Sequence, residues 1–319
     1  MKPRVGGEIV YFLVVAMSLL LRISQGVGVD DALGVDMSLL FTLAVQLLIF
    51  GLLPVLGWWM VMRTGANSTF RTLPRVFCLS KCHSRDFGRT LLMTVPILLL
   101  VGVAASAWQN FIYLTGFETG SSAPSEQTAA ALLAEVALSA VLPGIFEEFV
   151  HRGMLSTTFR DSGGKFIFVS ALLFALMHQN ILQFAHTFVL GLILACIVYC
   201  TGSVFPAMFV HFFNNFISVA SGYDGVVPAF GVIGTVRGWL YGSVAGVVVL
   251  IILAAVSVAV IFLLLRAMRF DAVREGRLPN APFFRSAAGA IPLSRDILLL
   301  GTVAIGVAAT LFSLVWGYL

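Results

Sequence analysis

Long apolar runs separated by short polar stretches dominate the hydrophobic pattern of the chain. A helix that crosses a lipid bilayer needs about 20 mostly apolar residues, and about nine runs approach or reach that length. They are Ile9–Ile23, Met37–Met62, Leu91–Leu114, Thr128–Val150, Phe166–Met177, Leu182–Cys200, Val204–Ala220, Leu240–Leu265 and Ile297–Trp316. The pattern predicts an all-α polytopic membrane protein, built as a bundle of about 8–9 transmembrane helices.

The composition supports a membrane protein. Hydrophobic residues make up 59% of the chain, charged residues only 11%, and the mean hydropathy is +1.00. A soluble protein of 319 residues could not cover its surface with so few charges. The first run follows Lys2 and Arg4 and could be a signal peptide, but no small-x-small cleavage site follows it, so a retained span is preferred.

Basic residues gather in alternate loops, after the second, fourth and eighth runs. They are Arg63, Arg71, Arg75, Lys81, Arg85, Arg89, Arg152, Arg160, Lys165, Arg266, Arg269, Arg274, Arg277 and Arg285. The loops Gly26–Asp36 and Gly116–Gln127 contain acidic residues and no Lys or Arg. The positive-inside rule therefore predicts a multi-pass protein of the cell membrane with a cytoplasmic N-terminus. The sequence pI near 9.0 then reflects topology and contact with anionic lipid, not nucleic-acid binding.

The chain shows no internal repeat, and three regions are expected. Residues 1–127 hold N-terminal spans and a basic loop, 128–222 a catalytic helix core, and 223–319 C-terminal spans and a second basic loop. The long basic connections Arg63–Arg89 and Arg266–Asp296 are expected to form amphipathic segments on the membrane surface.

The four cysteines suggest packing more than chemistry. Cys78, Cys82 and His83 could bind a metal ion, but no second ligand pair follows them, which disfavours that interpretation. Cys196 and Cys200 lie one turn apart inside a span and are expected to be packing residues.

Ionisable side chains inside the spans are few, and such residues are costly and usually functional. They are Glu135, Glu147, Glu148, His178, His186 and His211. No aspartate lies in a span, which excludes a two-aspartate membrane protease. The sequence also lacks the His-Glu-x-x-His zinc motif and the Gly-x-Ser-Gly of rhomboid serine proteases.

The fourth run ends with two adjacent glutamates and an arginine. Glu148 and Arg152 are one helical turn apart and can pair, whereas Glu147 projects about 100° away and is free to face another group. A partly desolvated glutamate becomes a better base near neutral pH. The alternative is that both glutamates only cap a helix near the membrane surface.

Two later runs repeat the one-turn spacing. Phe174 lies one turn before His178 and is expected to pack beside its imidazole, and Pro206 is expected to kink the helix before His211. His211 and Asn215 share a face and could donate two hydrogen bonds to one point, as an oxyanion requires. A structural histidine and an interhelical polar clasp remain the alternatives.

Glu-Glu-x-x-x-Arg, Phe-x-x-x-His and His-x-x-x-Asn, in this order on successive membrane helices, resemble the CAAX-protease and bacteriocin-processing (CPBP) family of intramembrane glutamate proteases. The similarity covers roughly Ala140–Ala220. The family usually has an aromatic residue before the motif arginine, where this chain has His151, which could hydrogen-bond to Glu147 and tune it.

The resemblance implies a site on the fourth, fifth and seventh spans. Glu147 would activate water, His178 would position it, and His211 and Asn215 would stabilise the oxyanion. Glu148, Arg152, Phe174 and His151 would be supporting residues. The cofactor stays open between none and Zn²⁺, for which Glu147, His178 and His211 would be the ligands.

The implied function is an intramembrane endopeptidase that cleaves a membrane-associated peptide, such as a prenylated CAAX or a leader peptide. Its partners would be that peptide and the lipid bilayer, without nucleic acid. The catalytic cavity is expected to open to the cytoplasm. A non-catalytic protein that keeps the fold and regulates a membrane partner is the main alternative, and a proton-coupled transporter is a further one.

Overall fold

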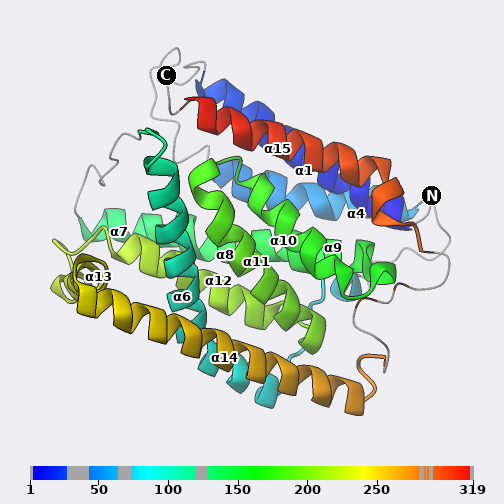
Figure 1. Ribbon diagram of the computed structural model, residues 1–319. Helices are drawn as coiled ribbons and strands as arrows, with labels where there is room; N and C mark the ends of the chain where they lie inside the picture. Colours follow the sequence, from blue (N-terminus) through cyan, green and yellow to red (C-terminus); the bar gives the residue numbers. More distant parts are fainter. Residues whose placement is uncertain are drawn as a thin grey trace.

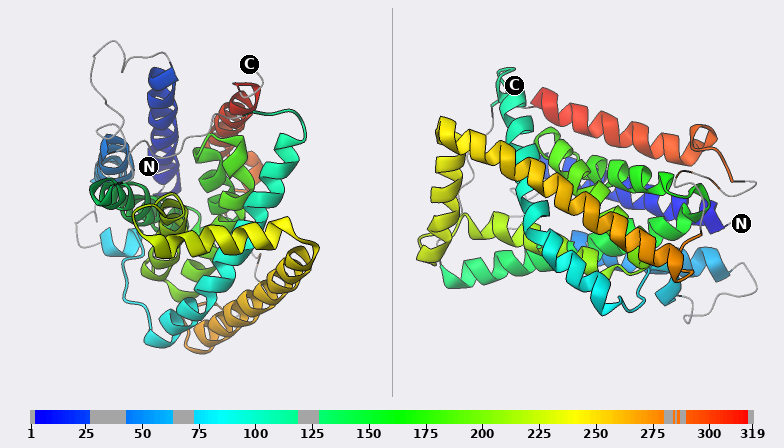
Figure 2. Two further views of the ribbon diagram at one scale, coloured as in Figure 1. Left: turned by 90° about the vertical axis from the view of Figure 1, so that its left-hand side faces the viewer. Right: turned by 60° about the horizontal axis from the view of Figure 1, so that its bottom comes forward.

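The protein is a helical bundle in a computed structural model that describes residues 3–26, 43–63, 73–118, 128–279 and 290–316, together with Phe284 and Ser286. Within these residues there is no strand, and the only β-bridge pairs Leu79 with Ser203. Long helices lie side by side, with α14 along the outside of α6 and α15 beside α1 (Figures 1 and 2).

The apolar helices of the described residues follow the predicted runs. In chain order the helices are α1 (Pro3–Gly26), a π-helix (Val45–Leu52), α4 (Leu53–Arg63), α5 (Leu73–Val76), α6 (Ser84–Tyr113), α7 (Ala129–Glu135), α8 (Leu142–Glu148), α9 (Leu155–Thr158), α10 (Lys165–Met177), α11 (Ile181–Thr201), α12 (Phe205–Ala220), α13 (Gly231–Gly242), α14 (Val244–Arg274) and α15 (Ile297–Trp316). Among them, 5 are long and apolar enough to cross a membrane and four are shorter. The predicted all-α polytopic fold is confirmed.

The fourth span is one continuous helix with irregular turns. Two π-helical segments, Val136–Val141 and Phe149–Met154, join α7, α8 and α9 into an apolar helix over Ala129–Thr158. The prediction that this span ends at Val150, with the two glutamates near its end, is wrong. The glutamates lie deep in the span because the apolar face continues through Met154 and Leu155, which are buried in the core.

Other predicted boundaries also need correction. Helix α6 begins at Ser84 and α14 ends at Arg274, so one end of each basic connection, Ser84–Arg89 and Arg266–Arg274, belongs to these long helices and not to surface segments. The predicted eighth run crosses a break at Ser243, which separates α13 from α14. Pro206 lies in the first turn of α12, where proline fits, so it does not kink the helix. The acidic residues of Gly26–Asp36 and the start of Met37–Met62 lie outside the described residues.

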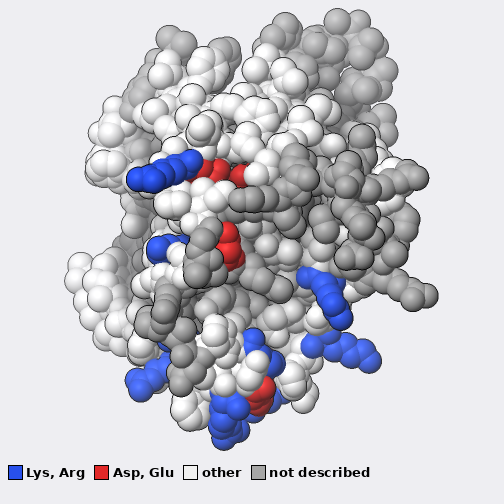
Figure 3. All heavy atoms as spheres, turned by 90° about the vertical axis from the view of Figure 1, so that its right-hand side faces the viewer, with Lys and Arg blue, Asp and Glu red and all other residues white. Residues whose placement is uncertain are grey.

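Ion pairs hold the ends of α6 and α14 together. Asp86 is fully buried and binds Arg277 at 2.9 Å and Arg89 at 3.3 Å. Arg89 also binds Asp271 at 2.8 Å. Charged side chains are spread over this end of the molecule, the right-hand side of Figure 1, which Figure 3 views directly. We call it the basic end.

The directions of α11 and α12 follow from contacts at the basic end. Arg277 donates to the carbonyl of Cys200 at the end of α11, and Leu79 pairs with Ser203 just before α12. Helix α11 therefore ends there and α12 starts there, so the beginning of α11 and the end of α12 lie at the opposite end of the bundle. Helix α13 lies at that opposite end as well (Figure 1).

Close helix packing depends on two glycines. A Cβ on Gly153 would lie 2.8 Å from the carbonyl oxygen of Phe77, and one on Gly191 would lie 3.0 Å from the Cα of Ala171 and 3.3 Å from Nη2 of Arg152. Only glycine lets these backbones approach so closely, and both contacts support the helices that carry the polar residues.

Candidate functional site

Glu148 is the centre of a buried polar cluster. Its Oε1 accepts a hydrogen bond from Nη1 of Arg152 at 2.7 Å, as the one-turn spacing predicts, and another from Nδ1 of His211 at 2.9 Å. Glu148 and Arg152 have no exposed side-chain surface and His211 has 2%. An ionised carboxylate only accepts hydrogen bonds, so Nδ1 of His211 carries a proton. The pair thus fixes both the position and the orientation of the imidazole.

Glu147 faces a different set of groups. Its Oε1 accepts from Nε2 of Gln46, in the π-helix before α4, at 3.3 Å. Its Oε2 is buried, has no hydrogen-bond partner among the described residues, and lies 4.0 Å from Nε2 of His211. Glu147 therefore presents one carboxylate oxygen toward His211, just beyond hydrogen-bonding distance.

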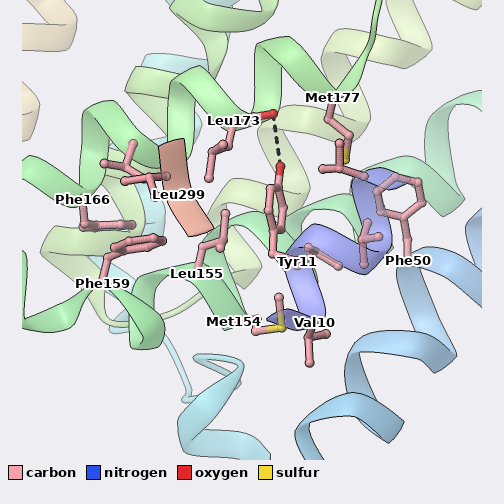
Figure 4. Packing of buried hydrophobic residues seen from close by; sticks show 14 of the residues in the cluster. Val10, Tyr11, Phe50, Met154, Leu155, Phe159, Phe166, Leu173, Met177 and Leu299 are labelled. Atoms are coloured by element: carbon pink, nitrogen blue, oxygen red, sulfur yellow. Dashed lines mark hydrogen bonds between the residues drawn. The ribbon is translucent and has the colours of Figure 1, made fainter. Parts of the chain in front are cut away.

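His151 supports Glu147 through the main chain and not through the carboxylate. Its Nδ1 lies 2.7 Å from the carbonyl oxygen of Glu147, which makes Nδ1 the protonated nitrogen of a neutral ring. Its Nε2 lies 3.0 Å from the hydroxyl of Tyr11, which also lies 3.1 Å from the carbonyl of Leu173. Figure 4 shows Tyr11 reaching from α1 to Leu173 within the apolar core. Helix α1 is thereby linked to the π-helical segment Phe149–Met154 and to α10.

Phe174 packs against several of these polar groups. Its ring is edge-on to His178 at 4.9 Å, to His151 at 5.0 Å and to His211 at 5.5 Å between centroids. The guanidinium of Arg152 lies 4.2 Å from the centre of the same ring. The predicted contact of Phe174 with His178 is confirmed, and the phenylalanine also separates the three imidazoles with an apolar spacer.

His178 and Asn215 present opposite hydrogen-bonding characters. Nδ1 of His178 lies 2.8 Å from the carbonyl oxygen of Phe174 and so carries a proton, and in a neutral ring Nε2 is then an acceptor. The amide oxygen of Asn215 accepts from Asn214 at 3.1 Å, so its NH₂ group remains to donate elsewhere. An acceptor and a donor from two helices therefore border one space.

That space is a polar cavity of about 570 Å³. The residues that line it are Gln46, Glu135, Leu138, Ser139, Pro143, Glu147, His178, Gln183, Asn215, Ser218, Val219, Ser221 and Gly222. Gln183 lies in the first turn of α11 and Ser221 just after α12, so the cavity extends toward the end opposite the basic end. The polar lining thus continues away from the basic end, while the side of the membrane to which the cavity opens stays a prediction.

The donor set does not resemble a metal centre. Within the described residues no three His, Cys, Asp or Glu side chains are arranged to hold a metal ion, and this includes Glu147, His178 and His211. The same holds for Cys78, Cys82 and His83. We therefore derive no step through zinc.

The structure brings most of the predicted residues into one site. Glu147, His178 and Asn215 line the cavity, while Glu148, His151, Arg152, Phe174 and His211 lie behind it. Sequence reasoning missed Gln46 and Tyr11, and it listed Glu135 among the ionisable residues of the spans without placing it in the site. Gln46 could have been found as a lone amide in an otherwise apolar run, where a polar group is costly. No sequence signal links Tyr11 to His151.

The bundle and its buried glutamates, histidines and asparagine define a multi-pass membrane protein with a polar site inside its helical core. Residues 129–217 match the family described as type II CAAX prenyl endopeptidase Rce1-like. The matched model is one of the CPBP family, which the three motifs also resemble. No curated protein and no solved structure was found to match the chain.

Proposed function

We propose that the protein is an intramembrane endopeptidase that hydrolyses a peptide bond with water activated by Glu147. The observation that carries this proposal is the meeting of the Glu147 carboxylate, the His178 acceptor and the Asn215 donor at one polar cavity inside an apolar bundle. Peptide hydrolysis requires a base for water and donors for the tetrahedral oxygen, and this set supplies both. The match of residues 129–217 to a protease family supports the same reaction.

Glu147 and His178 would hold the attacking water. Glu147 accepts one water proton while the lone pair on Nε2 of His178 accepts a hydrogen bond from the other O–H group. The water oxygen attacks the peptide carbonyl carbon and the carbonyl π bond becomes an oxyanion. Glu147 then returns the proton to the amide nitrogen as the C–N bond breaks, which releases a carboxylic acid and an amine.

Asn215 and His211 would stabilise the oxyanion. The NH₂ group of Asn215 borders the cavity, and His211 can donate from Nε2 when its ring carries both protons. Glu148 accepts from Nδ1 at 2.9 Å and so orients the ring for that donation.

The polar lining favours a peptide over a lipid chain as the occupant of the cavity. Amide, hydroxyl and carboxylate groups cover much of its wall, whereas an isoprenoid would need apolar surface. The substrate would therefore place its peptide segment here, with any lipid anchor remaining in the bilayer.

The decisive experiment is hydrolysis of quenched fluorescent peptides, prenylated and unprenylated, by the purified protein in lipid. Glu147→Ala should abolish cleavage, while Glu275→Gln on an exposed site at the basic end should retain it. His178→Ala and His211→Ala should each lower kcat about 10²–10³-fold, since each removes a water partner or an oxyanion donor. His186→Ala is the matched histidine control, because His186 does not line the cavity and, unlike His211, forms no ion pair with Glu147 or Glu148 among the described residues.

Two outcomes would contradict the proposal. One is a Glu147→Ala variant that is folded by thermal denaturation and still cleaves. The other is unchanged activity in both His178→Ala and His211→Ala. Absence of cleavage by the wild-type protein across the panel, together with retained peptide binding, would favour a non-catalytic protein that binds a membrane partner.

A further inference from the structure

A second carboxylate lines the cavity far from the proposed water. Glu135, the last residue of α7, is half-buried, and its Oε2 accepts a hydrogen bond of 2.8 Å from the hydroxyl of Tyr223. Tyr223 is buried and follows α12, so two segments hold the carboxylate in place. Fixing a carboxylate beside a cavity prepares it to bind a cation there, because little conformational freedom is lost on binding.

The π-helical segment Val136–Val141 brings Glu135 onto the face of Glu147. The two residues are 12 apart (147 − 135), and a regular α-helix, at about 100° per residue, would set them about 120° apart. A π-helix closes i→i+5 bonds and turns by only about 80° per residue. Six residues in that conformation reduce the offset to roughly zero, and both carboxylates line the same cavity.

The charge of the lining is one-sided. Glu135 and Glu147 are its only acidic residues, and no Lys or Arg is among the lining side chains that the structure describes. Arg152 is paired with Glu148 behind the wall and does not line the cavity. A cavity that contains carboxylates without basic side chains attracts cations, and its low-dielectric walls strengthen that attraction.

We propose that Glu135 is a specificity-determining residue that binds a Lys or Arg side chain of the peptide substrate. Twelve residues of helix rise about 18 Å, which an extended peptide covers in about five residues. The basic residue would therefore lie about five positions from the bond that is cleaved. This inference rests on the proposed endopeptidase function and adds a substrate class to it, that of peptides with a cationic side chain at this spacing.

The test uses peptides of one length that differ only in having Lys, Gln or Glu at successive positions from the cleaved bond. With wild-type protein, Lys about five positions away should raise kcat/KM about tenfold over Gln, mainly through KM, because a charge-assisted hydrogen bond is gained. Glu135→Lys should reverse the preference, so that Glu peptides are cleaved better than Lys peptides. Glu135→Gln, which keeps the size and the Tyr223 contact, should remove the preference.

Glu118→Lys is the matched control, because Glu118 is exposed and is not among the cavity residues. It changes net charge by the same amount and should leave the Lys preference intact. Equal preference in wild type and Glu135→Lys, or the same loss with Glu118→Lys, would overturn the proposal. Melting temperatures would exclude a folding defect in each variant.

A peptide-binding assay with the Glu147→Ala variant tests the cation site independently of the proposed hydrolysis. Labelled Lys and Glu peptides would be titrated against Glu147→Ala, with and without Glu135→Lys, by fluorescence anisotropy. Charge-dependent binding without cleavage by the wild type would refute the protease and keep the cation site. Cleavage by the wild type without a charge preference in either assay would keep the protease and refute the cation site.

Discussion

At the scale of single residues, the two adjacent glutamates differ because their neighbours differ. Glu148 accepts from Arg152 and His211 and is fully buried, so it serves as a fixed counter-charge. Among the described residues, Glu147 accepts a single side-chain hydrogen bond, of 3.3 Å from Gln46, and it borders the cavity. Two identical side chains on one helix thus acquire distinct environments from the 100° between them.

Removal of the Glu148 carboxylate should lower stability together with activity. Glu148→Ala removes the acceptor of Nη1 of Arg152 and of Nδ1 of His211 and leaves the buried guanidinium without its counter-charge, and removing one partner of a buried ion pair costs about 3–5 kcal/mol. The melting temperature in lipid or detergent should fall by several degrees. A melting temperature equal to that of wild type would contradict the pairing.

A double variant distinguishes lost pairing from lost packing. Glu148→Leu with Arg152→Met removes both charges and keeps apolar volume, so it should be more stable than Glu148→Leu alone. Equal stability of the single and double variants would show that the stranded guanidinium is not the cause.

At the scale of helices, contacts within one helix could be predicted and contacts between helices could not. The Glu148–Arg152 pair and the Phe174–His178 contact follow from one-turn spacing, and the structure contains both. The Glu148–His211 and Tyr11–His151 hydrogen bonds depend on how helices dock, which no spacing encodes. The π-helical turns could not be predicted either, because hydropathy depends on apolar content and does not show whether backbone hydrogen bonds are of the i→i+4 or the i→i+5 type.

Helix docking at the site depends on Gly191, and substitution there should be harmful. Gly191→Ala would place a Cβ 3.0 Å from the backbone of Ala171 and 3.3 Å from Nη2 of Arg152. Forcing α10 and α11 apart should cost about 1–3 kcal/mol and displace Arg152 from Glu148. We expect a lower melting temperature and a reduced kcat in the peptide assay.

Gly102 provides the matched control. It lies in the membrane-spanning helix α6, and an added Cβ there meets nothing within 4 Å. Gly102→Ala should be neutral or stabilising by roughly 0.5–1 kcal/mol, because alanine favours the helix. If both substitutions change the melting temperature by similar amounts, the close approach of Gly191 to Ala171 is not the cause of the loss.

At the scale of the whole molecule, hydropathy predicted the number and order of the apolar helices but not where several of them end. Helices α6 and α14 continue beyond their apolar runs because Asp86 and Asp271 pair with arginines from neighbouring turns and helices. Charged residues that the sequence assigns to loops, such as Asp86 and Asp271, are thus helical in the structure. Glu275, in the turn just after α14, also pairs with arginines, and hydrogen bonds from Arg85 and Arg277 lower the pKa of its carboxyl.

The extent of the cavity changes the expected side of substrate entry. Arginines cluster at the basic end, whereas the cavity extends toward the end formed by the start of α11 and the end of α12. If the basic end is cytoplasmic, as the positive-inside rule predicts, the cavity opens on the outer side of the membrane. A peptide with a basic residue, presented from outside the cytoplasm, would then fit the site better than a cytoplasmic CAAX protein.

Cysteine labelling tests this orientation directly. In a background with the native cysteines replaced by serine, Ser80→Cys marks the basic end and Ala229→Cys the cavity end; both positions are exposed. A membrane-impermeant maleimide should label Ala229→Cys in right-side-out vesicles and Ser80→Cys only in inverted ones. The reverse result would place the cavity on the cytoplasmic side and make this chain an exception to the charge rule. Labelling of both from one side would contradict the arrangement of α11 and α12, because their contacts with Leu79 and Arg277 require the two positions to lie at opposite ends of the bundle.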